Sequence, residues 1–180
     1  MARDRLYEAI GEAMSERQHY LCEFRLGGKR LYVVWYSDTR DGLLVSTNRT
    51  LVSFESPEQA RAYASSHAIA LESQHMSVFD FDLIESWCGR PLSERIDCGE
   101  FLNAWNMFAD VASSLEGVSE FVAANAGMTD IYEKVFYGNN LPSITPEGQH
   151  YKPTWSVEEV KALADLLSLG LQELRRSLSA

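Results

Sequence analysis

The sequence predicts an α+β fold, in which a four- to five-stranded antiparallel sheet packs against a mainly helical C-terminal half. Apolar residues alternate with period two between residues 20 and 36, which is typical of half-buried strands. From residue 80 onward they recur every three or four positions, and capping sequences mark helix starts. The 180 residues are expected to form one domain, mostly β with helices over 1–79 and mostly α over 80–180.

Residues 4–17 are expected to form a first helix with a narrow apolar stripe. The clearest strand signal follows around Gly27-Gly28, a two-residue turn of the kind that the twist of antiparallel strands favours. With Leu26 opposite Lys29, the two strands share one continuous apolar face. Its residues pair as Phe24 with Leu31, Cys22 with Val33, and Tyr20 with Trp35. This register is predicted by burial, since a slip of one residue would turn the face outward.

A second hairpin is expected around Asn48-Arg49, so that four strands would form an antiparallel meander. The expected register places Thr47 against Thr50, Val45 against Val52 and Leu43 against Phe54. Residues 76–79 are a candidate fifth strand.

Capping sequences predict where the main helices begin. Ser56, with proline at the first helical position and glutamine at the third, starts a helix that runs to about His67. Asp97 and Glu100 form a capping box at the start of a second. Its apolar stripe consists of Phe101, Trp105, Phe108, Ala112 and Leu115. A short helix is expected to start at 82–85 and to end before Gly89, and others are expected over 118–124 and over 129–136.

The last helix has the strongest start. Ser156 caps it, Glu159 closes the capping box, and Trp155 is placed to pack on Val160 as a hydrophobic staple. Gly170 interrupts its leucine stripe at a cost of about 1 kcal/mol relative to alanine. A close contact with another helix is therefore expected at Gly170.

The excess negative charge is confined to the middle third of the chain. Residues 72–133 contain twelve acidic and two basic side chains, a difference of −10, which equals the formal net charge of the whole chain. The flanking segments each contain equal numbers of acidic and basic residues. Like charges gathered in one region repel one another, so this distribution favours a basic partner whose field is complementary.

Composition excludes several other classes of partner. A pI near 4.8 argues against nucleic acid and against an anionic membrane surface, because both require a basic protein surface. The three widely spaced cysteines, Cys22, Cys88 and Cys98, are expected to be reduced thiols in a cytoplasmic protein. No leader and no apolar run near 18 residues is seen, so neither export nor membrane anchoring is expected. The oligomeric state stays open.

No catalytic residue, metal ligand or cofactor is predicted. The four histidines are scattered, and no cysteine or histidine pair has the spacing of a zinc site. Asp80-x-Asp82 resembles the acidic pair of some metal-dependent transferases, so a small hydrolase or transferase that uses these two residues with a divalent metal is the alternative function. A cysteine and a histidine that meet only in space, and a scaffold that assembles with itself, also stay open.

The C-terminal third carries a resemblance to a known family. The residues concerned are Ile131 to Pro142, Thr145 to Gly148, and Tyr151-x-Pro153-x-Trp155-Ser156, with a fainter match at Phe54-x-Ser56 and from Asp80 to Trp87. These motifs resemble cytosolic immunity proteins of bacterial contact-dependent growth inhibition and related polymorphic toxin systems. The resemblance implies a protein that binds one cognate toxin domain, often a nuclease, and neutralises it without catalysis. It implies no contact residues, since these families vary most where they meet the toxin.

The acidic middle third is therefore expected to cover a basic surface of a toxin domain. The residues expected at that surface are Asp80, Asp82, Glu85, Asn106, Asp110, Glu116 and Glu120.

Overall fold

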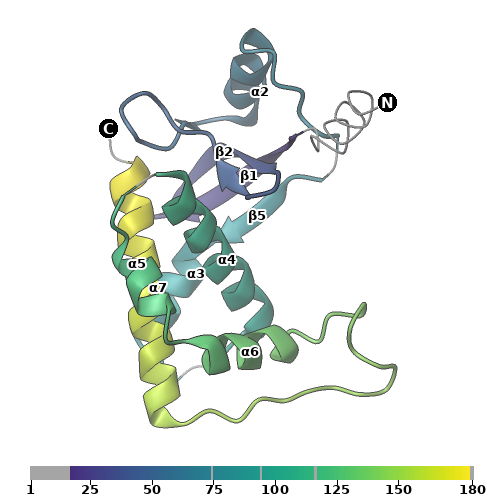
Figure 1. Cartoon of the computed structure of the whole chain (residues 1–180), viewed down its shortest axis with the longest axis vertical. Helices are drawn as coiled ribbons and strands as arrows, with labels where there is room; N and C mark the ends of the chain where they lie inside the picture. The colour runs from purple at the N-terminus through teal and green to yellow at the C-terminus, as the bar shows by residue number, and fades with distance from the viewer. Residues whose placement is uncertain (1–16, 74, 94, 116, 179–180) are drawn as a thin grey trace, which may run out of the picture.

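The computed structural model describes residues 17–73, 75–93, 95–115 and 117–178 (Figure 1). Within them the chain is α+β, with a five-stranded mixed sheet from the N-terminal half and helices mostly in the C-terminal half. This confirms the predicted fold class. Residues 4–16 of the helix expected over residues 4–17 lie outside the described part.

The first hairpin has the register that burial predicts. Strands β1 (Gln18–Leu26) and β2 (Lys29–Ser37) pair with Leu26 opposite Lys29 and Tyr20 opposite Trp35. Gly27 and Gly28 turn the chain with φ of 62° and 70°, a left-handed backbone that glycine adopts without steric cost.

The second hairpin differs from the expectation. Arg49 adopts a left-handed φ of 61°, and the backbone of Ser46 pairs with that of Thr50, so the loop has three residues instead of two. The extra residue shifts the pairing by one position, and Val45 lies opposite Leu51 instead of Val52.

The predicted four-stranded meander is also wrong, because both short strands pair with β2. Strand β3 (Gly42–Leu43) pairs with Trp35 and Tyr36 near the end of β2, and β4 (Ser53–Phe54) pairs with Tyr32 and Val33 in its middle. Together they make one interrupted edge strand, from which residues 45–52 project as a loop. The fifth strand is present as β5 (Ser77–Asp80), but it runs parallel to β1, so the sheet is mixed instead of antiparallel.

Six helices surround the sheet in the described part of the chain. They are α2 (Pro57–Ser66), α3 (Phe81–Cys88), α4 (Cys98–Ser114), α5 (Glu120–Asn125), α6 (Thr129–Gly138) and α7 (Val157–Leu178). Helix α2 lies on one face of the sheet, and the other helices lie on the opposite side (Figure 1). None of these described helices is long and apolar enough to cross a bilayer.

The predicted helix starts are confirmed by side-chain hydrogen bonds to backbone amides. Ser56 accepts from the Gln59 N–H, and Asp97 accepts from those of Gly99 and Glu100. At α7 the box is reciprocal, since Ser156 accepts from the Glu159 N–H while the Glu159 carboxylate accepts from the Ser156 N–H. These bonds satisfy amides that the first helical turn leaves without partners.

The main core lies between the helices and the apolar face of the hairpin. Phe24, Phe81 and Phe108 are almost fully buried. Phe24 meets Phe81 edge to face with ring centroids 5.0 Å apart, and Phe81 stacks on Phe108 at 5.3 Å. Gly170 of α7 lies directly against Phe108, where a Cβ atom would overlap the ring. The close helix contact expected at Gly170 is thus confirmed.

Candidate functional site

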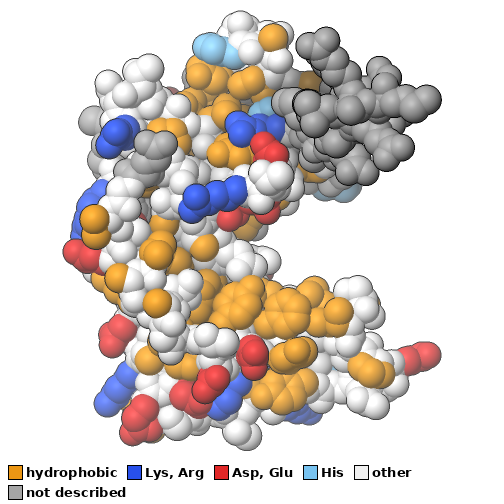
Figure 2. Space-filling view, viewed as in Figure 1, with side chains coloured by type: hydrophobic (Ala, Val, Ile, Leu, Met, Phe, Trp, Pro, Cys, Tyr) orange, Lys and Arg blue, Asp and Glu red, His pale blue; other side chains and the backbone are white. Residues whose placement is uncertain are grey.

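The molecule is hollowed between the sheet and the arm that α6 and residues 139–156 form (Figure 2). Helix α4 joins the two sides. Asn106 of α4 accepts a hydrogen bond from the Tyr132 hydroxyl of α6 at 3.1 Å, and it also lines a cavity that α4 shares with the sheet.

The cavity has a volume of about 330 Å³. The sheet contributes Tyr20, Cys22, Trp35, Ser77 and Phe79, and α4 contributes Asn103, Asn106, Met107 and Asp110. The α4 side chains lie on one stripe because their spacing of three and four residues follows the helical period. The sheet residues lie on the face that the hairpin register turns toward the helices.

Asp110 is the charged group of this cavity. Its Oδ2 accepts a hydrogen bond of 2.8 Å from the Trp35 indole N–H, and the side chain is half-buried. Burial raises the pKa of the Asp110 carboxyl, the Trp35 hydrogen bond opposes that rise, and the charge of Asp41 adds to it. No ion pair among the described residues involves Asp110.

The other expected surface carboxylates mostly have partners within the chain. Asp80 caps α3 through the Leu83 N–H and lies 3.6 Å from Arg25. Asp82 accepts hydrogen bonds from the Gly27 and Gly28 amides at 2.6 and 2.9 Å, which fastens the tip of the first hairpin to α3.

The remaining expected residues do not join them in one place. Glu85 forms an ion pair with Arg175 of α7 at 2.6 Å. Glu120 is exposed in the first turn of α5, and Glu116 lies outside the described residues. Of the seven expected residues, Asn106 and Asp110 lie together in one cavity. Asp80 and Asp82 lie near each other at the start of α3.

Sequence reasoning missed the aromatic part of the cavity. Tyr20 and Trp35, which lie beside Asp110, were expected only to pair across the hairpin. Their ring centroids are 5.5 Å apart. The signal available in the sequence was their position on the apolar face of the hairpin, at the end away from the Gly27-Gly28 turn.

Neither a cluster of metal ligands nor a thiol of lowered pKa is found in the described part of the chain. It contains no group of three or more histidine, cysteine, aspartate or glutamate side chains that could hold a metal ion. Burial raises the pKa of the Cys22 thiol to about 12, and it also raises the pKa values of Cys88 and Cys98. Since the thiolate is the nucleophile, these cysteines are poor candidates for covalent chemistry at neutral pH.

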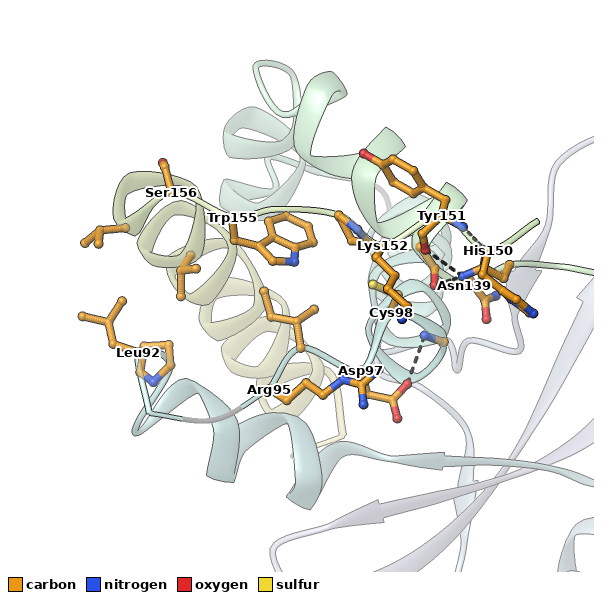
Figure 3. Close-up of a pocket in the computed structure, with 18 residues that line it drawn as sticks. Leu92, Arg95, Asp97, Cys98, Asn139, His150, Tyr151, Lys152, Trp155 and Ser156 are labelled. Atoms are coloured by element: carbon orange, nitrogen blue, oxygen red, sulfur yellow. Dashed lines mark hydrogen bonds between the residues drawn. The ribbon is translucent and has the colours of Figure 1, made fainter. Parts of the chain in front are cut away.

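A larger cavity of about 1140 Å³ lies at the other end of α4, bordered by the start of α7 (Figure 3). Residues of the C-terminal motifs that resemble immunity proteins form much of its wall. Asn140, at a φ of 51°, donates to the Gly138 and Tyr151 carbonyl oxygens and accepts from the Tyr151 N–H, so it fixes the returning chain. Among the described residues, Arg95 and Lys152 line this cavity with a single carboxylate, Asp97, which already caps α4, so the charge of the cavity does not favour a basic partner.

Comparison with known proteins adds no assignment: no family model, no curated protein and no solved structure matches this chain.

Proposed function

We propose that this chain is a cytoplasmic immunity protein that binds a cognate basic toxin domain through the hollowed face and neutralises it without catalysis. The resemblance of the C-terminal third to immunity proteins of contact-dependent growth inhibition supports the proposal. So does the concentration of the whole net charge of −10 between residues 72 and 133.

The observation that carries the proposal is the half-buried Asp110 carboxylate. A charge that is partly removed from water needs compensation, and within the described chain Asp110 has a single neutral donor, the Trp35 indole. Asp82 and Glu85, in contrast, already have amide or arginine partners. A basic partner seated on α4 would supply the missing counter-charge.

Helix α6, which the Tyr132 hydroxyl joins to Asn106 of α4, carries a row of aromatic side chains. Tyr132 and Phe136 stack at 6.3 Å on α6, and Tyr137 and Tyr151 extend the row edge to face at 6.4 Å. Aromatic residues are enriched in protein interfaces, where they provide rigid contact area. Tyr137 and Tyr151 are exposed, with 54% and 45% of their surface accessible.

The test is whether this protein binds and neutralises the C-terminal domain of the protein that the adjacent upstream gene encodes. The wild-type protein is expected to bind that domain and to protect cells that express it. Asp110→Lys is expected to weaken binding by about 2–5 kcal/mol, since it places a like charge against the partner. The matched control is Glu55→Lys, a reversal at an exposed position just before α2 and outside the acidic segment 72–133. Equal affinity of Asp110→Lys and wild type would refute this surface assignment.

A metal titration separates this proposal from a metal-dependent enzyme. A ligand that binds the native state raises the melting temperature by mass action. We expect that Mg²⁺, Mn²⁺ and Ca²⁺ do not raise the melting temperature through Asp82. A rise that occurs in the wild-type protein and is lost in Asp82→Ala would favour the alternative function at Asp80 and Asp82.

A further inference from the structure

The cavity between α4 and the sheet combines three kinds of side chain. Tyr20 and Trp35 provide aromatic surface, Asp110 provides a carboxylate, and Asn103 and Asn106 provide amides at the exposed side. Cys22, Met107 and Phe79 contribute apolar surface. The volume of about 330 Å³ is at the lower end of the range for small-molecule sites, so the occupant is a single side chain or a molecule of similar size.

The charge in the cavity selects a cation. Trp35 donates to Oδ2 of Asp110, and no hydrogen bond to Oδ1 is present among the described residues. The carboxylate is therefore oriented by one bond and keeps acceptor capacity. An anion would meet both Asp110 and the nearby charge of Asp41, whose field already opposes ionisation of Asp110.

The lining also distinguishes between kinds of cation. A divalent metal ion needs several oxygen ligands in a hydrated shell, and this cavity offers one carboxylate beside apolar and aromatic surface. An ammonium group is compact and strongly hydrated, so entry beside Cys22 and Phe79 is unfavourable. A guanidinium group is planar and weakly hydrated, stacks on aromatic rings, and has five N–H donors for carboxylate and amide oxygens.

We propose that this cavity receives the guanidinium group of an arginine from the toxin domain, with its plane against the Tyr20–Trp35 pair and its N–H groups directed to Asp110. This inference rests on the proposed function, because it names the group of the basic partner that would dock there. Arginine is among the residues that contribute most to binding energy at interfaces, and buried sites near the centre favour it.

The first test uses ethylguanidinium chloride as the probe and the Trp35 indole N–H as the reporter, since that proton is bonded to Asp110. Protein labelled with ¹⁵N at tryptophan gives separate indole resonances, which Trp35→Phe assigns. We expect the Trp35 resonance to shift in a saturable way with ethylguanidinium, and at least about tenfold more weakly with ethylammonium or with sodium chloride at equal ionic strength.

Three variants test the assignment. Asp110→Asn keeps an acceptor for Trp35 but removes the charge, and it is expected to weaken probe binding at least about tenfold. Asn103→Lys places a competing cation at an exposed position of the cavity and is expected to do the same without disturbing the fold. Glu55→Gln, an exposed change just before α2 and outside the acidic segment 72–133, is the matched control and is expected to leave binding unchanged.

The second test measures the affinity of the same variants for the toxin domain. Asp110→Asn and Asn103→Lys are expected to bind it more weakly than the wild-type protein, and the control is expected to bind it equally. The inference is overturned if the Trp35 resonance does not shift when ethylguanidinium is added, or if Asp110→Asn and Asn103→Lys bind the toxin domain as tightly as the wild-type protein does. In those cases the immunity function stands, provided that the wild-type protein binds. Failure of the wild-type protein to bind the toxin domain would overturn the immunity function instead, whatever the probe titration shows.

Discussion

Asp82 provides the sharpest test of how the sheet is held to the helices. Its carboxylate accepts hydrogen bonds from both amides at the tip of the first hairpin, Gly27 at 2.6 Å and Gly28 at 2.9 Å. The hairpin tip and α3 are more than 50 residues apart in the sequence, so these two bonds fix a long-range contact. We predict that Asp82→Ala destabilises the protein although the side chain is only half-buried.

The size of the effect follows from the two hydrogen bonds. A bond to a charged acceptor contributes about 1.5–3 kcal/mol and a neutral one about 0.5–1.5 kcal/mol. Because the freed amides at this surface site can be rehydrated, a contribution near 1–1.5 kcal/mol per bond is appropriate. Asp82→Ala should therefore lower the free energy of unfolding by about 2–3 kcal/mol. For a chain of this size, that corresponds to a melting temperature about 4–12 °C lower.

Urea denaturation followed by circular dichroism measures this loss, and Asp82→Asn separates charge from geometry. An amide has one oxygen in place of two, so Asp82→Asn should lose about half as much stability as Asp82→Ala. Glu133→Ala, at an exposed position of α6, is the control and should change stability by less than about 0.5 kcal/mol. If Asp82→Ala is no more destabilising than Glu133→Ala, the two amide bonds do not hold the hairpin and the reasoning fails.

Three further changes probe the core, the C-terminal arm and the cavity. Gly170→Ala should lower the free energy of unfolding by about 1–2 kcal/mol in a denaturation experiment, because overlap with Phe108 outweighs a helix-propensity gain of about 1 kcal/mol. Asn140→Ala should destabilise the protein more than Asn140→Gly does, because both variants lose the bonds to Tyr151 but only alanine is strained at a φ of 51°. Hydrogen exchange over residues 139–156 measures the difference. Asp110→Asn should stabilise the protein at pH 7. The folded state raises the pKa of Asp110, so wild-type stability falls as pH rises through that pKa; the advantage of Asp110→Asn should vanish in melting curves below the ordinary aspartate pKa of 3.8.

Local signals predicted individual elements well. The hairpin register around Gly27-Gly28 follows from alternation and turn chemistry within 17 residues of chain, and it is confirmed. The starts of the helices at Ser56, Asp97 and Ser156 depend on a cap and a residue three positions later, and they are confirmed as well. Such features can be predicted because the interacting groups are neighbours in sequence.

The second hairpin shows where local signals end. Asn48-Arg49 indicated a two-residue turn, but a left-handed Arg49 lengthens the loop by one residue. Leu51 also donates a backbone hydrogen bond to Ser177 of α7, so the loop conformation depends on a helix more than 120 residues away. The parallel pairing of β5 with β1 likewise joins residues that no local pattern connects.

The candidate site divides in the same way. Asn106 and Asp110 could be selected from the sequence because both lie on the polar stripe of one helix. The partner of each carboxylate could not, since Asp82 meets the hairpin amides and Glu85 meets Arg175 only after folding. Charge counts treat these carboxylates as equivalent, while the contacts among the described residues give Asp82 and Glu85 partners and give Asp110 no cation.

The sequence by itself determined the α+β class, the first hairpin, the main helix starts and the segregation of charge, because each depends on spacing along the chain. Only the tertiary structure decided that the edge strand is interrupted, that β5 is parallel, and that Trp35 lies against Asp110 across 75 residues. The physical reason is that these contacts depend on which surfaces the packed core leaves adjacent, and that is a property of the whole chain.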